Sequence, residues 1–274
     1  MTPDLFAISR RIAQRIENAE AAVSLACVRY VLQRDPLSPV TMREIGGGVA
    51  IFFGAGSPLT QALGVGLRGP VGAEELDQLE HFFFSRGAAA TVSLCPMADA
   101  GLALALEQRG FRLDHFEHTL LGWLWSAPVA AGPRDAVRVG PQEHTEWARM
   151  VVAGFESDDP ELVDLVRVFA ASEGARPYWA RREGQPAGGG VSRIEDGIAM
   201  FYCGSTVPEF RGRGVQTAVI RRRIEDAVRA GCDFAVACVA PDSQSHRNYE
   251  RAGFRVAYTK ALFVKELPDA ANSG

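Results

Sequence analysis

The sequence predicts an α/β (α+β) protein that contains two copies of one domain in tandem. Apolar runs alternate with amphipathic helical segments along the 274 residues. Two predicted helices have similar endings, at residues 107–111 and 250–254, and each continues into an apolar run. Cys95 and Cys238 each stand fifteen residues before the glycine of these endings. The order strand, helix, strand, helix, strand therefore occurs twice, with an offset of about 143 residues.

The first copy begins with a helix over residues 5–33, which ends before Asp35-Pro36. Further strands are predicted over 40–53, 59–67 and 89–94, and one or two more over 111–125. Helices are predicted over 73–85 and 98–108. Residues 127–135 contain two prolines, a glycine and small residues, which is typical of a linker. We therefore expect domains over residues 1–126 and 136–274.

The second copy is predicted to contain strands and helices in a related order. Strands are expected over 137–139, 176–182, 189–194, 198–207 and 234–240, and helices over 143–155, 160–172 and 216–230. A short helix follows Pro241-Asp242 and leads into a further apolar run. In the helix over 216–230, Ile220, Ile224 and Ala227 form an apolar stripe. The run 221–223 of three arginines on this helix is interpreted as largely a solvated face, with contact to an acidic cofactor as the alternative.

The most informative segment lies between the strand over 198–207 and the following helix. Gly212 and Gly214 flank Arg213, and Arg211 precedes them. Two glycines at a strand-to-helix junction let backbone N–H groups converge, and the positive end of a helix favours an anion there. The segment predicts a phosphate-binding loop, with a tight turn that carries two solvated arginines as the alternative.

Together with the later segment 249–254, this loop resembles the GNAT superfamily of acyl-CoA-dependent N-acyltransferases. The family pattern is Arg/Gln-x-x-Gly-x-Gly/Ala, and Arg211 to Val215 fit it, while Gln216 departs from the small last residue. The resemblance covers about residues 137–267. It implies two tandem GNAT-like domains, each a mixed, mostly antiparallel twisted sheet flanked by helices.

The resemblance also implies that acetyl-CoA, or another acyl-CoA, lies between the strands 198–207 and 234–240. The pantetheine arm would pair with the backbone of Ser205, Thr206 and Val207. The diphosphate would bind the loop, and two further residues at the last helix would contact the cofactor. The loop residues are Arg211, Gly212, Arg213, Gly214, Val215, Gln216 and Thr217, and the helix residues are Asp242 and Ser245.

Tyr249 fits the general acid that protonates the leaving thiolate in this family, and the alternative is a tyrosine that packs at a helix end. A general base is not identified, because the strand 198–207 carries no carboxylate. The loop residues Glu156, Asp158, Glu195 and Asp196 are candidates, as is a chain of waters, and His246 would only tune the site. Four aromatic residues are candidates for the acceptor pocket or for the core, namely Phe155, Tyr178, Trp179 and Phe201.

The first copy lacks the groups that this chemistry needs. At the offset of 143 residues, Pro70 replaces Arg213 and has no N–H donor, and Val71 replaces Gly214 with a branched side chain. Leu106 stands in the place of Tyr249 and cannot donate a proton. We therefore expect the first domain to be degenerate and the second to bind the acyl-CoA.

Composition limits the partners and the location. The net charge is −4, and no charge run indicates a nucleic-acid or membrane surface. The five cysteines form no C-x-x-C pair, and we interpret them as core residues of a reduced, cytoplasmic protein without a metal. The expected function is acyl transfer to the amine of a small molecule or peptide. The alternative is a non-catalytic acyl-CoA-binding sensor, and association into a homodimer is left open.

Overall fold

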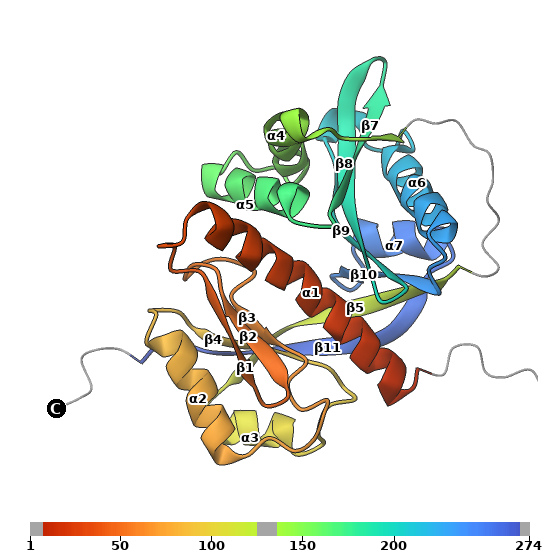
Figure 1. Cartoon of the computed structure of the whole chain (residues 1–274). Coiled ribbons are helices and arrows are strands. Elements are labelled where there is room, and N and C mark those ends of the chain that lie inside the picture. The colour runs from red at the N-terminus through yellow and green to blue at the C-terminus, as the bar shows by residue number, and fades with distance from the viewer. Residues whose placement is uncertain (1–7, 125–135, 269–274) are drawn as a thin grey trace, which may run out of the picture. The chain divides into compact units, whose positions relative to one another are not determined.

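The computed structural model describes residues 8–124 and 136–268, which divide into two compact units (Figure 1). The first unit extends to His118 and takes up the chain again from Ala257, whereas the second spans Thr119–Val256. The last part of the chain thus belongs to the first unit, which differs from the boundaries expected from the sequence. The expected linker over 127–135 lies outside the described residues.

The first unit is built on a mixed sheet with helices. Its elements are α1 (Arg10–Arg34), β1 (Thr41–Ile45), β2 (Gly48–Phe52), β3 (Gln61–Leu63), α2 (Ala73–Phe84), β4 (Ala90–Leu94), α3 (Leu102–Gln108), the start of β5 (Arg112–Trp123) and most of β11 (Arg255–Lys265). β1, β2 and β3 are antiparallel neighbours, and β3 runs parallel to β4. β11 is antiparallel to β4, with Ala261 opposite Leu94.

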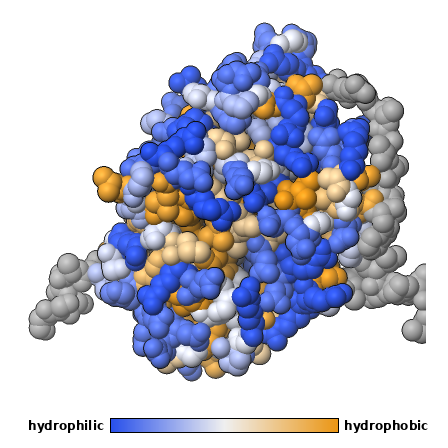
Figure 2. Space-filling model, in the orientation of Figure 1, coloured by the Kyte–Doolittle hydropathy of each residue, from blue (hydrophilic) through white to orange (hydrophobic). Residues whose placement is uncertain are grey.

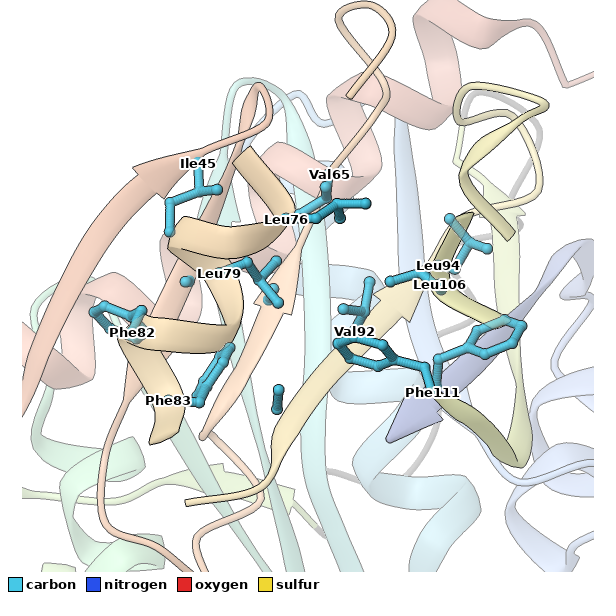
Figure 3. Close-up of a cluster of buried hydrophobic side chains, with 14 of the residues drawn as sticks. Ile45, Val65, Leu76, Leu79, Phe82, Phe83, Val92, Leu94, Leu106 and Phe111 are labelled. Carbon is cyan, nitrogen blue, oxygen red and sulfur yellow. The ribbon is translucent and has the colours of Figure 1, made fainter. Parts of the chain in front are cut away.

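The core of the first unit lies between α2, α3 and the sheet. Phe83, Val92 and Leu106 come from α2, β4 and α3, are buried, and meet in one cluster in Figure 3. Apolar residues three and four positions apart on α2 place its side chains on one face, which packs on the strands. Burying such side chains supplies most of the free energy that favours folding.

The second unit repeats this order of strands and helices. After the end of β5 come β6 (Ala136–Arg138), α4 (His144–Gly154), α5 (Pro160–Ala171), β7 (Arg176–Arg182), β8 (Gln185–Glu195), β9 (Ile198–Thr206), α6 (Val215–Arg229), β10 (Phe234–Val239) and α7 (Gln244–Arg251). β6 to β9 are antiparallel neighbours, and β9 runs parallel to β10. Two antiparallel pairings in the first unit, and three in the second, precede one parallel pairing across a helix, so the predicted repeat is present in the fold.

Most elements lie where the sequence predicts them, and the main differences have local causes. The strand expected over 59–67 ends at Leu63, because Gly64 and Gly66 turn the backbone with φ of 70° and 77°. The N–H of Gly66 then donates to the carbonyl of Gly46 at 2.9 Å, which stabilises this turn. The helix expected from residue 98 begins only at Leu102, after Gly101.

Surface residues are mainly polar, although some apolar side chains are exposed. Hydrophilic residues cover much of the face shown in Figure 2, with apolar areas between them. Leu37 and Leu104 are 93% and 58% exposed. None of the helices in the described part of the chain is both long enough and apolar enough to span a bilayer.

The buried Glu17 on α1 makes the stability of the first unit depend on pH. Its side chain accepts a hydrogen bond from the Tyr258 hydroxyl at 2.7 Å, and burial raises the pKa of Glu17 from 4.5 to about 7, against the attraction of Lys260. Because the pKa is higher in the folded state, stability is retained below about pH 4.5 and is lost as the pH rises through 7.

We expect Glu17→Gln to stabilise the protein at pH 8, by roughly 2–3 kcal/mol, and to change little at pH 5. Thermal unfolding of both proteins at the two pH values measures this difference. Glu44→Gln is the matched control, because the Glu44 side chain is exposed. Equal pH dependence in the wild type and in Glu17→Gln would contradict the assignment.

Candidate functional site

β9 and β10 part from one another halfway along β9. Their parallel pairing runs from Ile198 opposite Phe234 to Phe201 opposite Ala237, although β9 continues to Thr206. Cys203 has a positive φ of 50°, and the register with β8 shifts between Gly189 and Val191. Such a bulge bends a strand. The last part of β9 therefore leaves β10 and opens a cleft between the two strands.

A cavity of about 700 Å³ lies at this opening. It is lined by the end of β9, the loop before α6, the first turn of α6, one face of α7 and the end of α4. All of these elements belong to the second unit. Gly154 lets α4 approach β9 closely, since a Cβ at this position would lie 2.5 Å from the Ser205 Oγ.

The loop before α6 presents backbone donors to the cavity. Gly212 and Gly214 have φ of 75° and 76°, which glycine adopts without strain. Among the described residues, no acceptor is found for the N–H groups of Gly212, Gly214, Val215, Gln216 and Thr217. These groups and the helix dipole form a site that suits phosphate oxygens.

The corresponding helix of the first unit has an end that disfavours anions. The first turn of α2 contains Glu74 and Glu75, and the Glu75 carboxylate accepts a hydrogen bond from the N–H of Gly72 at 2.8 Å. The first turn of α6 carries no acidic residue, and its N-cap Gly214 has no side-chain cap. Carboxylates at a helix N-terminus satisfy its donors and repel other anions. This contrast supports the interpretation of the first unit as degenerate.

Arg211 is held at the edge of the cavity by the end of α4. Its guanidinium lies 2.5 Å from a carboxylate oxygen of Glu156 and donates to the carbonyl of Gly154 at 3.1 Å. Arg213 points to a different place, where it pairs with the exposed Glu183 at 3.2 Å. Of the two loop arginines, only Arg211 lines the cavity.

Several polar side-chain atoms near the cavity are buried without a hydrogen-bond partner in the described structure. They are the Ser205 Oγ, the Thr206 Oγ1 and the Gln216 Oε1. A buried polar group that lacks a partner costs free energy, so such groups favour a polar ligand. Gln216, which departs from the family pattern, occupies space left by Gly204, where a Cβ would lie 2.9 Å from the Gln216 Nε2.

Most residues predicted to bind a cofactor line the cavity, and three do not. Those that line it are Ser205, Thr206, Arg211, Gly212, Gly214, Val215, Gln216, Thr217 and Ser245. The N–H of Val207 donates to Ala187 at 3.0 Å, so it is not available to a ligand. Arg213 pairs with Glu183, as described above. Asp242 lies outside the cavity, with its side chain 94% exposed and paired with Arg247 at 2.7 Å.

Tyr249 lies in the core of the second unit and does not line the cavity. It is 3% exposed, and its ring packs on Phe254 with centroids 5.0 Å apart. Its hydroxyl accepts a hydrogen bond from Arg223 at 3.0 Å. Burial raises the pKa of Tyr249 above its ordinary value, while the charge and the hydrogen bond of Arg223 lower it. The group is therefore protonated at neutral pH and has one cationic neighbour.

The candidate bases do not line the cavity. Glu156 pairs with Arg211, and Asp158 is exposed in the loop after α4. Glu195 and Asp196 lie at the turn before β9, at the end where β9 is still paired with β10. None of the described residues around the cavity is Asp, Glu or His. Of the candidate aromatic residues, only Phe155 lines the cavity, whereas Tyr178, Trp179 and Phe201 are buried in the core.

The sequence analysis overlooked several residues around the cavity. Gln244, Asn248 and Arg251 line it beside Ser245, and their spacing of four and three residues places them on one helix face. Arg223 is wholly buried, so its interpretation as part of a solvated face was wrong. Spacings of four residues along Val215, Val219, Arg223 and Ala227 would have indicated this buried face.

One protein-family model matches the part of the chain that carries the cavity. Residues 142–254 match the model described as Acetyltransferase (GNAT) family. This segment contains β9, β10, the glycine loop and α7. No curated protein matches the chain.

Solved structures share the fold over nearly the whole chain. A GCN5-related N-acetyltransferase from Kribbella flavida is 20% identical, with a TM-score of 0.69, and the match covers 93% of this chain and 95% of that one. A tandem GNAT protein from the clavulanic acid biosynthesis pathway is 14% identical, with a TM-score of 0.60 and coverage of 97% and 96%. A GCN5-related N-acetyltransferase from Sphaerobacter thermophilus is 15% identical, with a TM-score of 0.57 and coverage of 95% and 94%. The fold is therefore that of a tandem GNAT protein.

We expect Gly214→Val to weaken binding of acetyl-CoA at least about tenfold, because a branched residue resists the positive φ that directs the loop donors. Calorimetric titration measures the affinity. Gly231→Val is the matched control, since Gly231 has a similar φ of 73°, open space around it and a place outside the cavity. Equal losses in both variants would contradict a specific role of the loop.

We expect Glu156→Gln to increase the affinity for acetyl-CoA about two- to fivefold at low salt, because Arg211 is released and a negative charge is removed. The gain should shrink as salt screens these charges. Glu183→Gln is the control, since it frees only Arg213. Weaker binding by Glu156→Gln would mean that Glu156 instead holds Arg211 in its binding position.

Proposed function

From the GNAT-family domain at residues 142–254, we propose that the protein is an acyl-CoA-dependent N-acyltransferase. The acyl group, in the simplest case acetyl, passes from CoA to a primary amine of a small molecule or peptide. The observation that carries the proposal is the cavity where β9 leaves β10, with the uncapped glycine loop at its end. A strand edge and a phosphate site in one cleft fit the two ends of an acyl-CoA.

The residues present fit the polar parts of that molecule. Loop N–H groups from Gly212 to Thr217 and the side chain of Arg211 suit the diphosphate. The end of β9 at Ser205 and Thr206, which line the cavity, suits the amide groups of the pantetheine arm. Ser245 and Asn248 add polar side chains from α7.

The proposed reaction is direct attack of a neutral amine on the thioester carbonyl in a ternary complex. A C–N bond forms, the C–S bond breaks, and the electron pair stays on sulfur. Tyr249 gives its proton to that sulfur, the amine nitrogen loses a proton to solvent, and the phenol is reprotonated. Tyr249 is suited to the acid role because burial keeps the phenol protonated.

A non-catalytic acyl-CoA-binding sensor is the second candidate. It is favoured by the lack of a carboxylate or histidine among the described residues that line the cavity, because such a group usually serves as the base. Tyr249 favours the enzyme, since its place in the sequence fits the general acid of the family.

Calorimetry with acetyl-CoA, and then turnover with a panel of primary amines, tests the proposal. One molecule bound per chain, with release of free CoA in the presence of an amine, supports the enzyme. Binding without turnover of any amine would favour the sensor. The absence of binding would contradict both functions.

We expect Tyr249→Phe to lower kcat about a hundredfold, because the thiolate then leaves without a proton donor. The affinity for acetyl-CoA should stay within about twofold, since the glycine loop, Arg211 and the end of β9 are the groups proposed to bind it. Steady-state kinetics and calorimetry measure the two quantities. Full activity in this variant would remove Tyr249 as the acid.

A further inference from the structure

Arg223 is a buried cation in the second unit, and it does not line the cavity. Its side chain is wholly buried on α6, and no carboxylate of the described residues forms an ion pair with it. A buried charge without a counterion is costly, so a protein that keeps one has a use for it. The hydrogen-bond partners of this guanidinium indicate the role of Arg223.

Its donors are distributed over three acceptors. One nitrogen donates to the carbonyl of Val191 at 3.1 Å, where the register of β8 shifts, and another donates to Val219 at 3.4 Å. The third donates to the Tyr249 hydroxyl at 3.0 Å. Gly190 leaves the space, because a Cβ there would stand 3.0 Å from the guanidinium.

The pair formed by Arg223 and Tyr249 lies at the fork of β9 and β10. The guanidinium stacks on Phe201, the last residue of β9 that pairs with β10, at 4.6 Å from the ring centroid. It also lies 3.7 Å from the position of a Cβ at Gly204, which lines the cavity. The Arg223 guanidinium therefore lies next to Gly204 in the wall of the cavity.

The hydrogen bond has a defined direction, since a guanidinium can only donate. The Tyr249 oxygen therefore accepts from Arg223, and no described residue accepts the Tyr249 proton. On the proposed mechanism, the leaving sulfur is the acceptor of that proton. We propose that Arg223 is a positioning residue, which holds the Tyr249 hydroxyl with its proton directed to the leaving sulfur. This inference rests on the proposed acyl transfer.

The same contact stabilises the product of the proton transfer. When the phenol gives its proton to sulfur, the phenolate that remains lies beside the Arg223 cation until it regains a proton. The groups that face the phenol with charge or a titratable proton are Arg223 on α6 and Cys238 on β10. Loss of Arg223 would therefore raise the pKa of Tyr249 further.

A double-mutant cycle tests the role of Arg223. We expect Arg223→Met to lower kcat at least about tenfold, with the KM for acetyl-CoA within about twofold, and Arg223→Lys to restore part of the rate. In the Tyr249→Phe background, Arg223→Met should cost nothing more. Arg221→Met is the matched control, because Arg221 is exposed on the same helix.

The pH profile gives a readout that a purely structural role would not move. Because the pKa of Tyr249 rises without Arg223, the descending alkaline limb of kcat should move to higher pH in Arg223→Met and partly return in Arg223→Lys. Losses in kcat that are additive between the Arg223 and Tyr249 substitutions would overturn the inference. An alkaline limb that stays unchanged in Arg223→Lys and Arg223→Met would do the same. Neither result would contradict acyl transfer itself. A wild-type chain that acylates no amine would overturn the proposed function and, with it, this inference.

Discussion

The constraint on which the site depends is the early end of the pairing between β9 and β10. If the two strands stayed paired to the end of β9, no backbone edge of β9 would face the cavity. The positive φ of Cys203 and the register shift on β8 divert β9. Gly188, Gly189 and Gly190 make this possible, since a Cβ at each would meet a neighbouring atom at 3.0 Å or less. Close packing around the bulge thus fixes the cleft.

Positive charge and backbone donors are gathered around this cleft in the second unit. The α6 N-terminus and Arg211 lie at its rim, and Arg223 lies beneath it. In the first unit the same fold carries Glu74 and Glu75 at the equivalent helix end. The two units therefore differ less in their strands and helices than in the electrostatic character of one helix terminus.

Local patterns predicted much of the fold, and contacts that are not local account for the rest. Hydrophobic periodicity predicted the helices, and glycines at helix C-termini indicated the repeat. The pair Gly212 and Gly214 indicated the loop before α6. The sequence did not indicate that the last strand joins the first unit, since strand pairing depends on a distant partner. Arg223 was misjudged because a charge run suggests solvent, although its spacing on α6 places it on the buried face. Val207 was expected to bind the cofactor, but its N–H pairs with Ala187, which only the sheet reveals.

The proposed mechanism, in which Tyr249 is the acid and no base lines the cavity among the described residues, makes opposite demands on pH. On the proposed mechanism, the amine must lose its proton to solvent before it attacks, which favours higher pH, whereas Tyr249 must keep its proton. Burial widens the range in which both conditions hold, because it raises the pKa of the phenol. Arg223 lowers the pKa of Tyr249 and therefore narrows this pH range. The same effect makes the phenol a stronger acid, which gives up its proton more readily. On the proposed mechanism, the hydrogen bond between these two residues therefore sets the pKa of Tyr249 between two needs. The phenol must stay protonated at the working pH, and it must be acidic enough to protonate the sulfur.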